Sequence, residues 1–180
     1  MAPNKVTQEA NRERARRVLD RLTEAYPDAR CSLDFKNPLQ LLVATILAAQ
    51  CTDDRVNLTT PSLFKRYQAP KDYVAAPDEE LQEAVRSCGF YRQKAKAIKR
   101  ACQTIMDRFD GAVPGTMAEL LQLEGVGRKT ANVLLGECFN TPGIIVENHC
   151  KRVSARLGFT KSAEPGKLEQ DIMRLIPETR

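Results

Sequence analysis

The sequence predicts an all-α protein, and three observations lead to that fold class. Apolar residues recur at helical spacing along nearly the whole chain, and we find no convincing alternation of the kind that marks a half-buried strand. Helix-capping signals precede several of these stretches. The connections between them are short, as is typical of compact helical domains.

The first third of the chain contains three predicted helices. Residues 12–25 form a highly charged helix with a narrow apolar stripe. Asn37 and Pro38 mark the start of the next helix, because Asn is a favoured N-cap and Pro suits the first helical position. That helix is apolar on most sides, which predicts that it is buried at the centre of the fold. A third helix is expected to follow Thr52, with Pro61 interrupting or restarting it.

Five further helices are predicted in the rest of the chain, and most have a recognisable start or stop signal. Thr116 and Glu119 fit the S/T-x-x-E capping box, which predicts a helix that reaches about Leu123. The Thr-Pro-Gly sequence at 141–143 ends the helix after that one. The predicted spans are 78–87 (closed at Gly89), 92–109, 116–123, 128–140 and 167–176.

Composition limits the classes of function. Hydrophobic residues make up 42% of the 180 residues and charged residues 28%, so the chain is globular and long enough to bury a core. The formal net charge of +5 permits a polyanionic partner without requiring one. No two of the six cysteines form a CxxC pair, which disfavours a disulfide framework or a zinc site. The sequence shows no signal peptide and no membrane span, and we therefore expect a cytoplasmic protein.

The stretch LEGVGRKTANVLL, residues 123–135, contains a glycine turn directly before a helix. Gly125 and Gly127 have no side chains, so a phosphate group can approach the backbone N–H groups at the start of that helix. Arg128 and Lys129 add positive charge at the same place. Such a contact holds nucleic acid without reading its bases. A tight turn between two packed helices explains the same pattern, and the spacing does not separate these two interpretations.

Lys129 occupies an unusual position for a lysine. The positive end of the helix dipole disfavours a cation at a helix start, and the neighbouring Arg128 adds to that effect. Both influences favour the neutral amine, which is the form that acts as a nucleophile. The alternative is a charged lysine that binds phosphate, and the physical argument alone favours that alternative.

LEGVGRKTANVLL resembles the helix-hairpin-helix of the endonuclease III family of DNA base-excision glycosylases. Three further stretches match in the family's order: NPLQLLVATILAAQCTD (37–53), GFYRQKAKAIK (89–99) and VENHCKRVSARLGF (146–159). The resemblance implies the family's fold. Residues 31–141 would form a six-helix barrel-like domain with the helix-hairpin-helix at about 116–138. Residues 1–30 and 142–180 would form a second helical domain, incomplete at its C-terminal end.

The resemblance also implies the chemistry. By motif position, Lys129 is the lysine that attacks C1′ of the damaged nucleotide, and a lysine there indicates the bifunctional glycosylase/lyase branch. The family's catalytic aspartate, 18 residues later, corresponds to Glu147. A carboxylate there stabilises positive charge on the sugar and can relay a proton. Glutamate is a departure from the family pattern, because its extra methylene moves the carboxylate by about 1 Å, and such a shift can cost about 100-fold in rate. Asn148 is a candidate helix N-cap, and His149 is a candidate to orient this loop.

The resemblance further implies residues that hold an extruded nucleotide out of the duplex. Gln50 matches the glutamine that fills the vacated space, and Phe90 matches the apolar wedge. Without the resemblance, Gln50 is an ordinary polar residue at a helix end, and Phe90 is a candidate core residue. Arg128 and Thr130, with the two glycines of the turn, complete the expected DNA-binding set. The basic face from Arg92 to Arg100 either follows the DNA backbone or is simply solvated.

These points together predict a monomeric base-excision N-glycosylase with abasic-site β-lyase activity on oxidised pyrimidines in duplex DNA, acting at the nucleoid. The alternatives are a glycosylase of the same superfamily with another base specificity, or a catalytically impaired DNA-binding fragment. Many relatives hold a [4Fe–4S] cluster on four cysteines in a C-terminal segment. The six cysteines of this sequence lack cluster spacing, so we expect no cofactor and no metal in the chain as it stands.

Overall fold

Within residues 5–176, the part of the chain that the computed structural model describes, every regular element is a helix, which confirms the all-α prediction. None of the helices in this range is long and apolar enough to cross a membrane. The elements are α1 (Lys5–Ala25), α2 (Pro38–Leu47), α3 (Asp53–Arg66), α4 (Pro70–Ala75), α5 (Asp78–Ala84), the 3-10 helix η1 (Arg86–Cys88), α6 (Tyr91–Arg108), α7 (Met117–Leu120), α8 (Arg128–Phe139), α9 (Asn148–Arg156) and α10 (Pro165–Met173).

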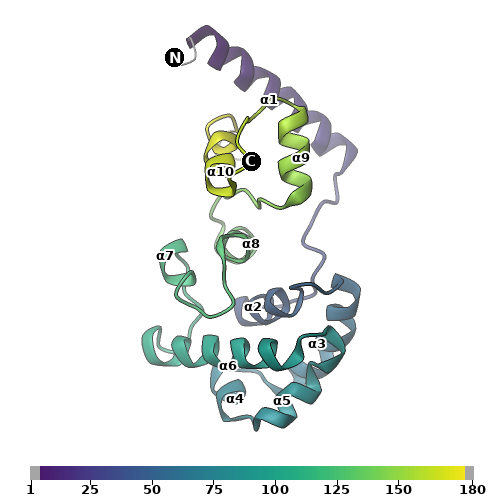
Figure 1. The fold of residues 1–180 in the computed structure, drawn as a ribbon, viewed down its shortest axis with the longest axis vertical. Coiled ribbons are helices and arrows are strands. Elements are labelled where there is room, and N and C mark those ends of the chain that lie inside the picture. The colour runs from purple at the N-terminus through teal and green to yellow at the C-terminus, as the bar shows by residue number, and fades with distance from the viewer. Residues whose placement is uncertain (1–4, 177–180) are drawn as a thin grey trace. The chain divides into compact units, whose positions relative to one another are not determined.

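The described chain divides into two compact units. Residues 31–140 form one unit, which contains α2 to α8. The residues before 31 and those after 140 form the other, which contains α1, α9 and α10. The second unit is therefore assembled from both ends of the chain (Figure 1).

Helix α2 lies at the centre of the unit formed by residues 31–140. It begins as predicted, with Asn37 as N-cap: the Asn37 side-chain oxygen accepts a hydrogen bond from the Gln40 amide at 3.0 Å. Helices α3, α6 and α8 all pack against it (Figure 1). Its buried residues face in nearly every direction around the helix, as expected for a central helix: Leu39, Leu41, Leu42, Val43, Ala44, Ile46 and Leu47.

Helix α6 is the second helix against which several others of this unit pack. It extends along α4 and α5, which pack against it together with η1 (Figure 1). Its apolar face carries the fully buried Ile98, Cys102 and Ile105. Tyr73 of α4, whose side chain is also fully buried, belongs to the same core. The predicted helix over 92–109 is confirmed to within one residue at each end.

Between residues 52 and 88 the structure differs from the predicted helices in three respects. Pro61 does not interrupt α3, which continues to Arg66, because proline removes only one backbone hydrogen bond here while Thr60 and Leu63 remain buried. Helix α4 was not predicted. The helix predicted over 78–87 is divided into α5 and η1, and the chain then turns at Gly89, whose φ is +68°.

The helix that precedes the glycine turn is shorter than predicted. Thr116 is its N-cap, accepting a hydrogen bond from the Glu119 amide at 3.3 Å, but α7 ends at Leu120 rather than near Leu123. The following helix begins at Arg128, as predicted, and ends at Phe139. The chain leaves that helix through Asn140, whose left-handed φ of 53° is typical of a helix C-terminus.

The other unit has a small core of its own, which includes Ala15, Leu168 and Ile172. The side chain of Arg12 donates a hydrogen bond to the backbone oxygen of Arg174 at 3.1 Å, which ties α1 to the end of α10. Helix α10 spans 165–173 rather than the predicted 167–176, because Glu164 caps it by accepting hydrogen bonds from the amides of residues 166 and 167.

Two leucines of α3 provide a matched test of this packing. Leu63 is 2% exposed, whereas Leu58 is 74% exposed. We expect Leu63→Ala to lower the free energy of unfolding by about 2–5 kcal/mol, because the truncation leaves a cavity in the core. Leu58→Ala should change it by about 0.5 kcal/mol or less. Urea denaturation followed by circular dichroism measures both, and equal losses would contradict the packing of α3.

Candidate active site

The glycine turn between α7 and α8 is fixed to the helices beneath it. Gly125 has a φ of +82°, a conformation that favours glycine. A β-carbon at this position would lie 3.3 Å from Cβ of Ala97 in α6 and 3.5 Å from Cγ1 of Ile46 in α2. Glycine is therefore required here for two reasons, and the turn has a defined position on α2 and α6.

Gly127 occupies a different environment. It is the N-cap of α8, with no side-chain hydrogen bond to cap the helix, and its φ of −97° is accessible to any residue. A β-carbon here would meet no atom within 4 Å, so the fold does not require a glycine. The space beside the start of α8 is open, and Lys129, the second residue of that helix, is exposed. Thr130, the third residue, is half-buried.

Gln50 and Phe90 share an uncommon backbone conformation. Gln50, three residues after the end of α2, has a φ of 53°, and Phe90, directly before α6, has a φ of 46°. Left-handed φ values are uncommon outside glycine and occur where the surrounding structure enforces them. Both side chains are exposed, and Phe90 is 58% exposed. The interpretation of Phe90 as a core residue is therefore wrong.

Glu147 caps helix α9. Its Oε1 accepts a hydrogen bond from the Cys150 amide at 2.7 Å, and its Oε2 lies 2.9 Å from Nδ1 of His149. Glu147, not Asn148, is the N-cap, so the suggestion that Asn148 caps the helix was wrong; Asn148 is the first residue of α9. The longer side chain of glutamate reaches both the Cys150 amide and the His149 ring, which fixes the carboxylate at the start of the helix.

This arrangement further favours the ionised form of the carboxylate. Hydrogen bonds from the backbone of His149, and then from its side chain and from the Cys150 amide, lower the pKa of Glu147 to about 2. The group is ionised at neutral pH. An ionised carboxylate with so low a pKa stabilises positive charge well but is a weak base.

The predicted catalytic and DNA-binding residues are divided between the two units. Gln50, Phe90, Lys129 and the glycine turn belong to the unit of residues 31–140, where α2 and α6 support them. Glu147 belongs to the other unit, at the start of α9.

The chain matches known proteins over most of its length. Residues 43–178 match the HhH-GPD superfamily of base excision DNA repair proteins. An endonuclease III from Synechocystis sp. is 50% identical over 170 residues, covering 94% of this chain and 78% of the relative, and one from Bacillus subtilis is 44% identical, covering 89% and 74%. The chain belongs to the endonuclease III family.

A solved structure agrees with the family assignment. The trapped covalent intermediate of an endonuclease III with DNA is 44% identical in sequence and aligns with a TM-score of 0.87, covering 93% of this chain and 79% of that one. The predicted helix-hairpin-helix glycosylase fold is therefore confirmed.

The residues of this endonuclease III family member do not fit an iron–sulfur cluster. Such a cluster needs four cysteine thiolates close together. Within residues 5–176, which include all six cysteines, no group of three or more His, Cys, Asp or Glu side chains is placed to hold a metal ion.

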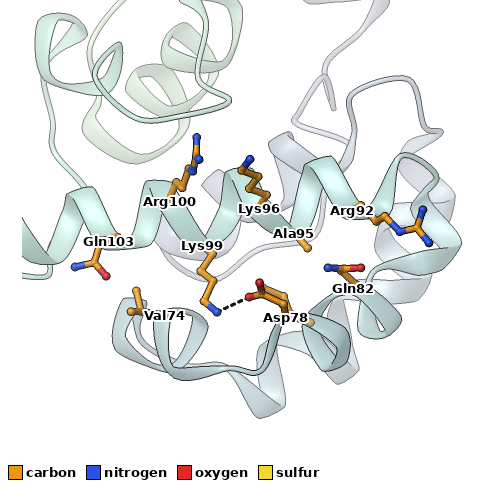
Figure 2. Close-up of a pocket in the computed structure, with 10 residues that line it drawn as sticks. Val74, Asp78, Gln82, Arg92, Ala95, Lys96, Lys99, Arg100 and Gln103 are labelled. Carbon is orange, nitrogen blue, oxygen red and sulfur yellow. Dashed lines mark hydrogen bonds and ion pairs between the residues drawn. The ribbon is translucent and has the colours of Figure 1, made fainter.

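The basic face of α6 borders a groove of about 590 Å³ shared with α4 and α5 (Figure 2). Lys99 extends into it and donates hydrogen bonds to Oδ1 of Asp78 at 2.5 Å and to the backbone oxygen of Ala76 at 2.8 Å. Arg100 forms an ion pair with Glu124 at 2.9 Å. Lys99 and Arg100 thus already have partners within the protein, which favours a structural role for these two residues.

One buried residue near the predicted DNA-binding loops was not predicted from the sequence. Lys94 is only 5% exposed, and it lies on the same face of α6 as Ile98 and Cys102. The spacing of four residues along this face is visible in the sequence, and it was the available signal. A charged residue in line with a buried apolar stripe needs partners, and the partners here are backbone carbonyls.

The two glycines of the turn provide a test of this description. Gly125→Ala should lower the free energy of unfolding by at least about 1–2 kcal/mol, because alanine disfavours a positive φ and its methyl group would crowd Ala97. Gly127→Ala should cost only about 0.5 kcal/mol, since alanine is a poorer N-cap than glycine. Urea denaturation of the two variants gives the comparison, and a larger loss for Gly127→Ala would refute it.

The pKa of Glu147 predicts a specific pH dependence of stability. Because this pKa lies near 2, below the ordinary value of 4.5, the charged carboxylate stabilises the fold above pH 4.5 and loses this effect as the pH falls toward 2. At pH 5 the native protein should exceed Glu147→Gln in unfolding free energy by about 1 kcal/mol. The difference should shrink steadily between pH 4.5 and pH 2. A difference independent of pH would show that the carboxylate is not held as described.

Proposed function

We propose that this endonuclease III family member is a bifunctional enzyme that excises oxidised pyrimidines from duplex DNA and cleaves the resulting abasic site. The observation that carries the proposal is the exposed amine of Lys129 on the first turn of α8, beside an open helix start. The structurally similar endonuclease III was trapped as a covalent intermediate with DNA, and this supports an amine nucleophile at the same motif position.

The proposed reaction begins with attack by the Lys129 amine on C1′ of the damaged nucleotide. The C1′–N bond breaks, its electron pair leaves with the base, and the base takes up a proton. Loss of the ring oxygen from C1′, with a proton from the amine, gives an imine between Lys129 and the opened sugar. Removal of a proton from C2′ then expels the 3′ phosphate by β-elimination, which cleaves the strand.

Glu147 is proposed to act through its charge. Breaking the N-glycosidic bond builds positive charge on the sugar ring, and an ionised carboxylate lowers the energy of that state. Its pKa of about 2 favours this electrostatic role over acceptance of the proton from the attacking amine. Its contacts with the His149 ring and the Cys150 amide restrict its motion, which suits a group that must be in place before charge develops.

The exposed side chains of Gln50 and Phe90 are proposed to hold the duplex open while the target nucleotide is extruded. The first amides of α8, with Gly125, Gly127, Arg128 and Thr130, are proposed to hold a DNA phosphate, because helix N-termini attract anions. We propose that the protein acts as a monomer on the DNA of the nucleoid, in the cytoplasm.

The experiment that tests this proposal is covalent trapping. Incubation with borohydride and duplex DNA that contains thymine glycol or an abasic site should give a protein–DNA adduct. Lys129→Gln should abolish the adduct while salt-sensitive binding of the DNA remains, since only the nucleophile is lost. Lys65→Gln, which removes another exposed lysine, should leave the yield unchanged.

Other results would contradict the proposal. Trapping by Lys129→Gln would show that another group is the nucleophile. Salt-sensitive binding without an adduct from the native protein would indicate a DNA-binding fragment without catalytic activity. An adduct at an abasic site, with no release of thymine glycol, would indicate a glycosylase of another base specificity, which a panel of damaged bases would identify.

A further inference from the structure

We infer that Lys94 is a positioning residue that fixes Gln50 and Phe90 relative to each other. The inference rests on the proposed function, in which these two side chains enter the DNA together. Lys94 itself is 5% exposed, so its ammonium group touches neither the DNA nor the reacting atoms. It acts through the two backbone segments that it joins.

The side chain of Lys94 joins the ends of two helices. Its Nζ donates one hydrogen bond to the backbone oxygen of Leu47 at 2.8 Å and another to that of Cys88 at 2.7 Å. Leu47 is the last residue of α2, and Cys88 is the last residue of η1. The two carbonyls are 41 residues apart in the sequence, and one ammonium group holds both.

This contact is favourable for electrostatic reasons. The last carbonyls of a helix have no partner within that helix, and in α2 they also form the negative end of its dipole. A buried cation needs such acceptors, because an unpaired charge in the core is costly. Leu47 and Cys88 are themselves buried, so water does not easily replace the ammonium group at these carbonyls.

The two segments held in this way lead directly to the predicted insertion residues. Gln50 lies three residues after Leu47, and Phe90 lies two residues after Cys88. Both have left-handed φ values, which the surrounding structure must enforce. A bridge between the preceding carbonyls supplies that constraint and sets the separation of the two exposed side chains.

The glycine turn packs against the same two helices, α2 and α6. The two residues that crowd Gly125 are Ile46, which precedes Leu47 in α2, and Ala97, one turn after Lys94 in α6. The junction of α2 and α6 thus supports three DNA-facing segments, and Lys94 is the polar link at that junction. Loss of the Lys94 side chain should displace Gln50 and Phe90 more than Lys129, because Lys129 lies on α8, after the glycine turn.

The test compares two reactions on the same protein preparation. The first is single-turnover release of thymine glycol from duplex DNA, which requires extrusion and a filled gap. The second is borohydride trapping at an abasic site in single-stranded DNA, which requires Lys129 but has no opposing strand to hold apart. The ratio of the two rates does not depend on how much of the variant is folded, because both use the same active molecules.

Lys94→Met keeps the length of the side chain and removes its donors. We expect the duplex reaction to slow by up to about 100-fold, the effect of a misplacement of about 1 Å, while trapping on the single strand is unchanged. Lys94→Arg, which keeps a donor group able to reach both carbonyls, should recover part of the loss. Lys65→Met is the control for removing a lysine, and it should alter neither rate.

A coupling measurement makes the assignment specific to the insertion residues. Phe90→Ala should slow the duplex reaction strongly in the native background. In the Lys94→Met background the same substitution should cost much less, because Phe90 is already misplaced. A 2-aminopurine beside the lesion reports extrusion by its fluorescence, and Lys94→Met should weaken that signal without abolishing binding.

Several outcomes would overturn the inference. Equal slowing of both reactions by Lys94→Met would show a purely structural role, and no slowing of either would show no role. Additive effects of Lys94→Met and Phe90→Ala would show that the two act independently. Failure of the proposed function is distinguishable, because the native protein would then neither release the base nor form an adduct. The extrusion signal would in that case still test Lys94 by binding alone.

Discussion

Burial of α2 on nearly all sides is the constraint on which the rest of the larger unit depends. A helix of ten residues with seven buried can be accommodated only if other helices surround it, and α3, α6 and α8 do so. Leu47, the last residue of α2, is therefore buried, and its carbonyl accepts a hydrogen bond from Lys94 instead of from solvent. The Lys94 ammonium group, the close approach at Gly125 and the turn that carries Gln50 all follow from where that buried end lies.

Much of the fold was predictable because local signals and tertiary packing agree. Asn37 as N-cap, the apolar α2 and the start of α8 at Arg128 were all read correctly from the sequence. The failures occurred where the local signal is incomplete or where packing outweighs it. Helix α4 follows Ala69, which has no capping side chain; the Asp72 carboxylate instead accepts hydrogen bonds from the amides of residues 68 and 69. Pro61 was misjudged because buried neighbours outweigh one lost backbone bond.

The candidate site was predictable from motif positions, but its local geometry was not. The motif placed Lys129 and Glu147, whose roles stay predictions. It did not show that the Glu147 carboxylate caps the N-terminus of α9. Asparagine is the more common N-cap, so propensity favoured Asn148. Lys94 escaped notice for a related reason. Its partners are backbone carbonyls, one of them 47 residues away at Leu47, and no pattern of side chains indicates them.

The left-handed backbone at Phe90 also limits which amino acids can take its place in related sequences. A positive φ is hardest for residues branched at Cβ, so valine, isoleucine and threonine are poorly tolerated there regardless of their hydrophobicity. Unbranched or γ-branched apolar residues, such as leucine and methionine, meet the backbone requirement and still present an apolar tip. The shape of the main chain thus restricts which residues can occupy this position as the family diverges, whatever the role of the side chain.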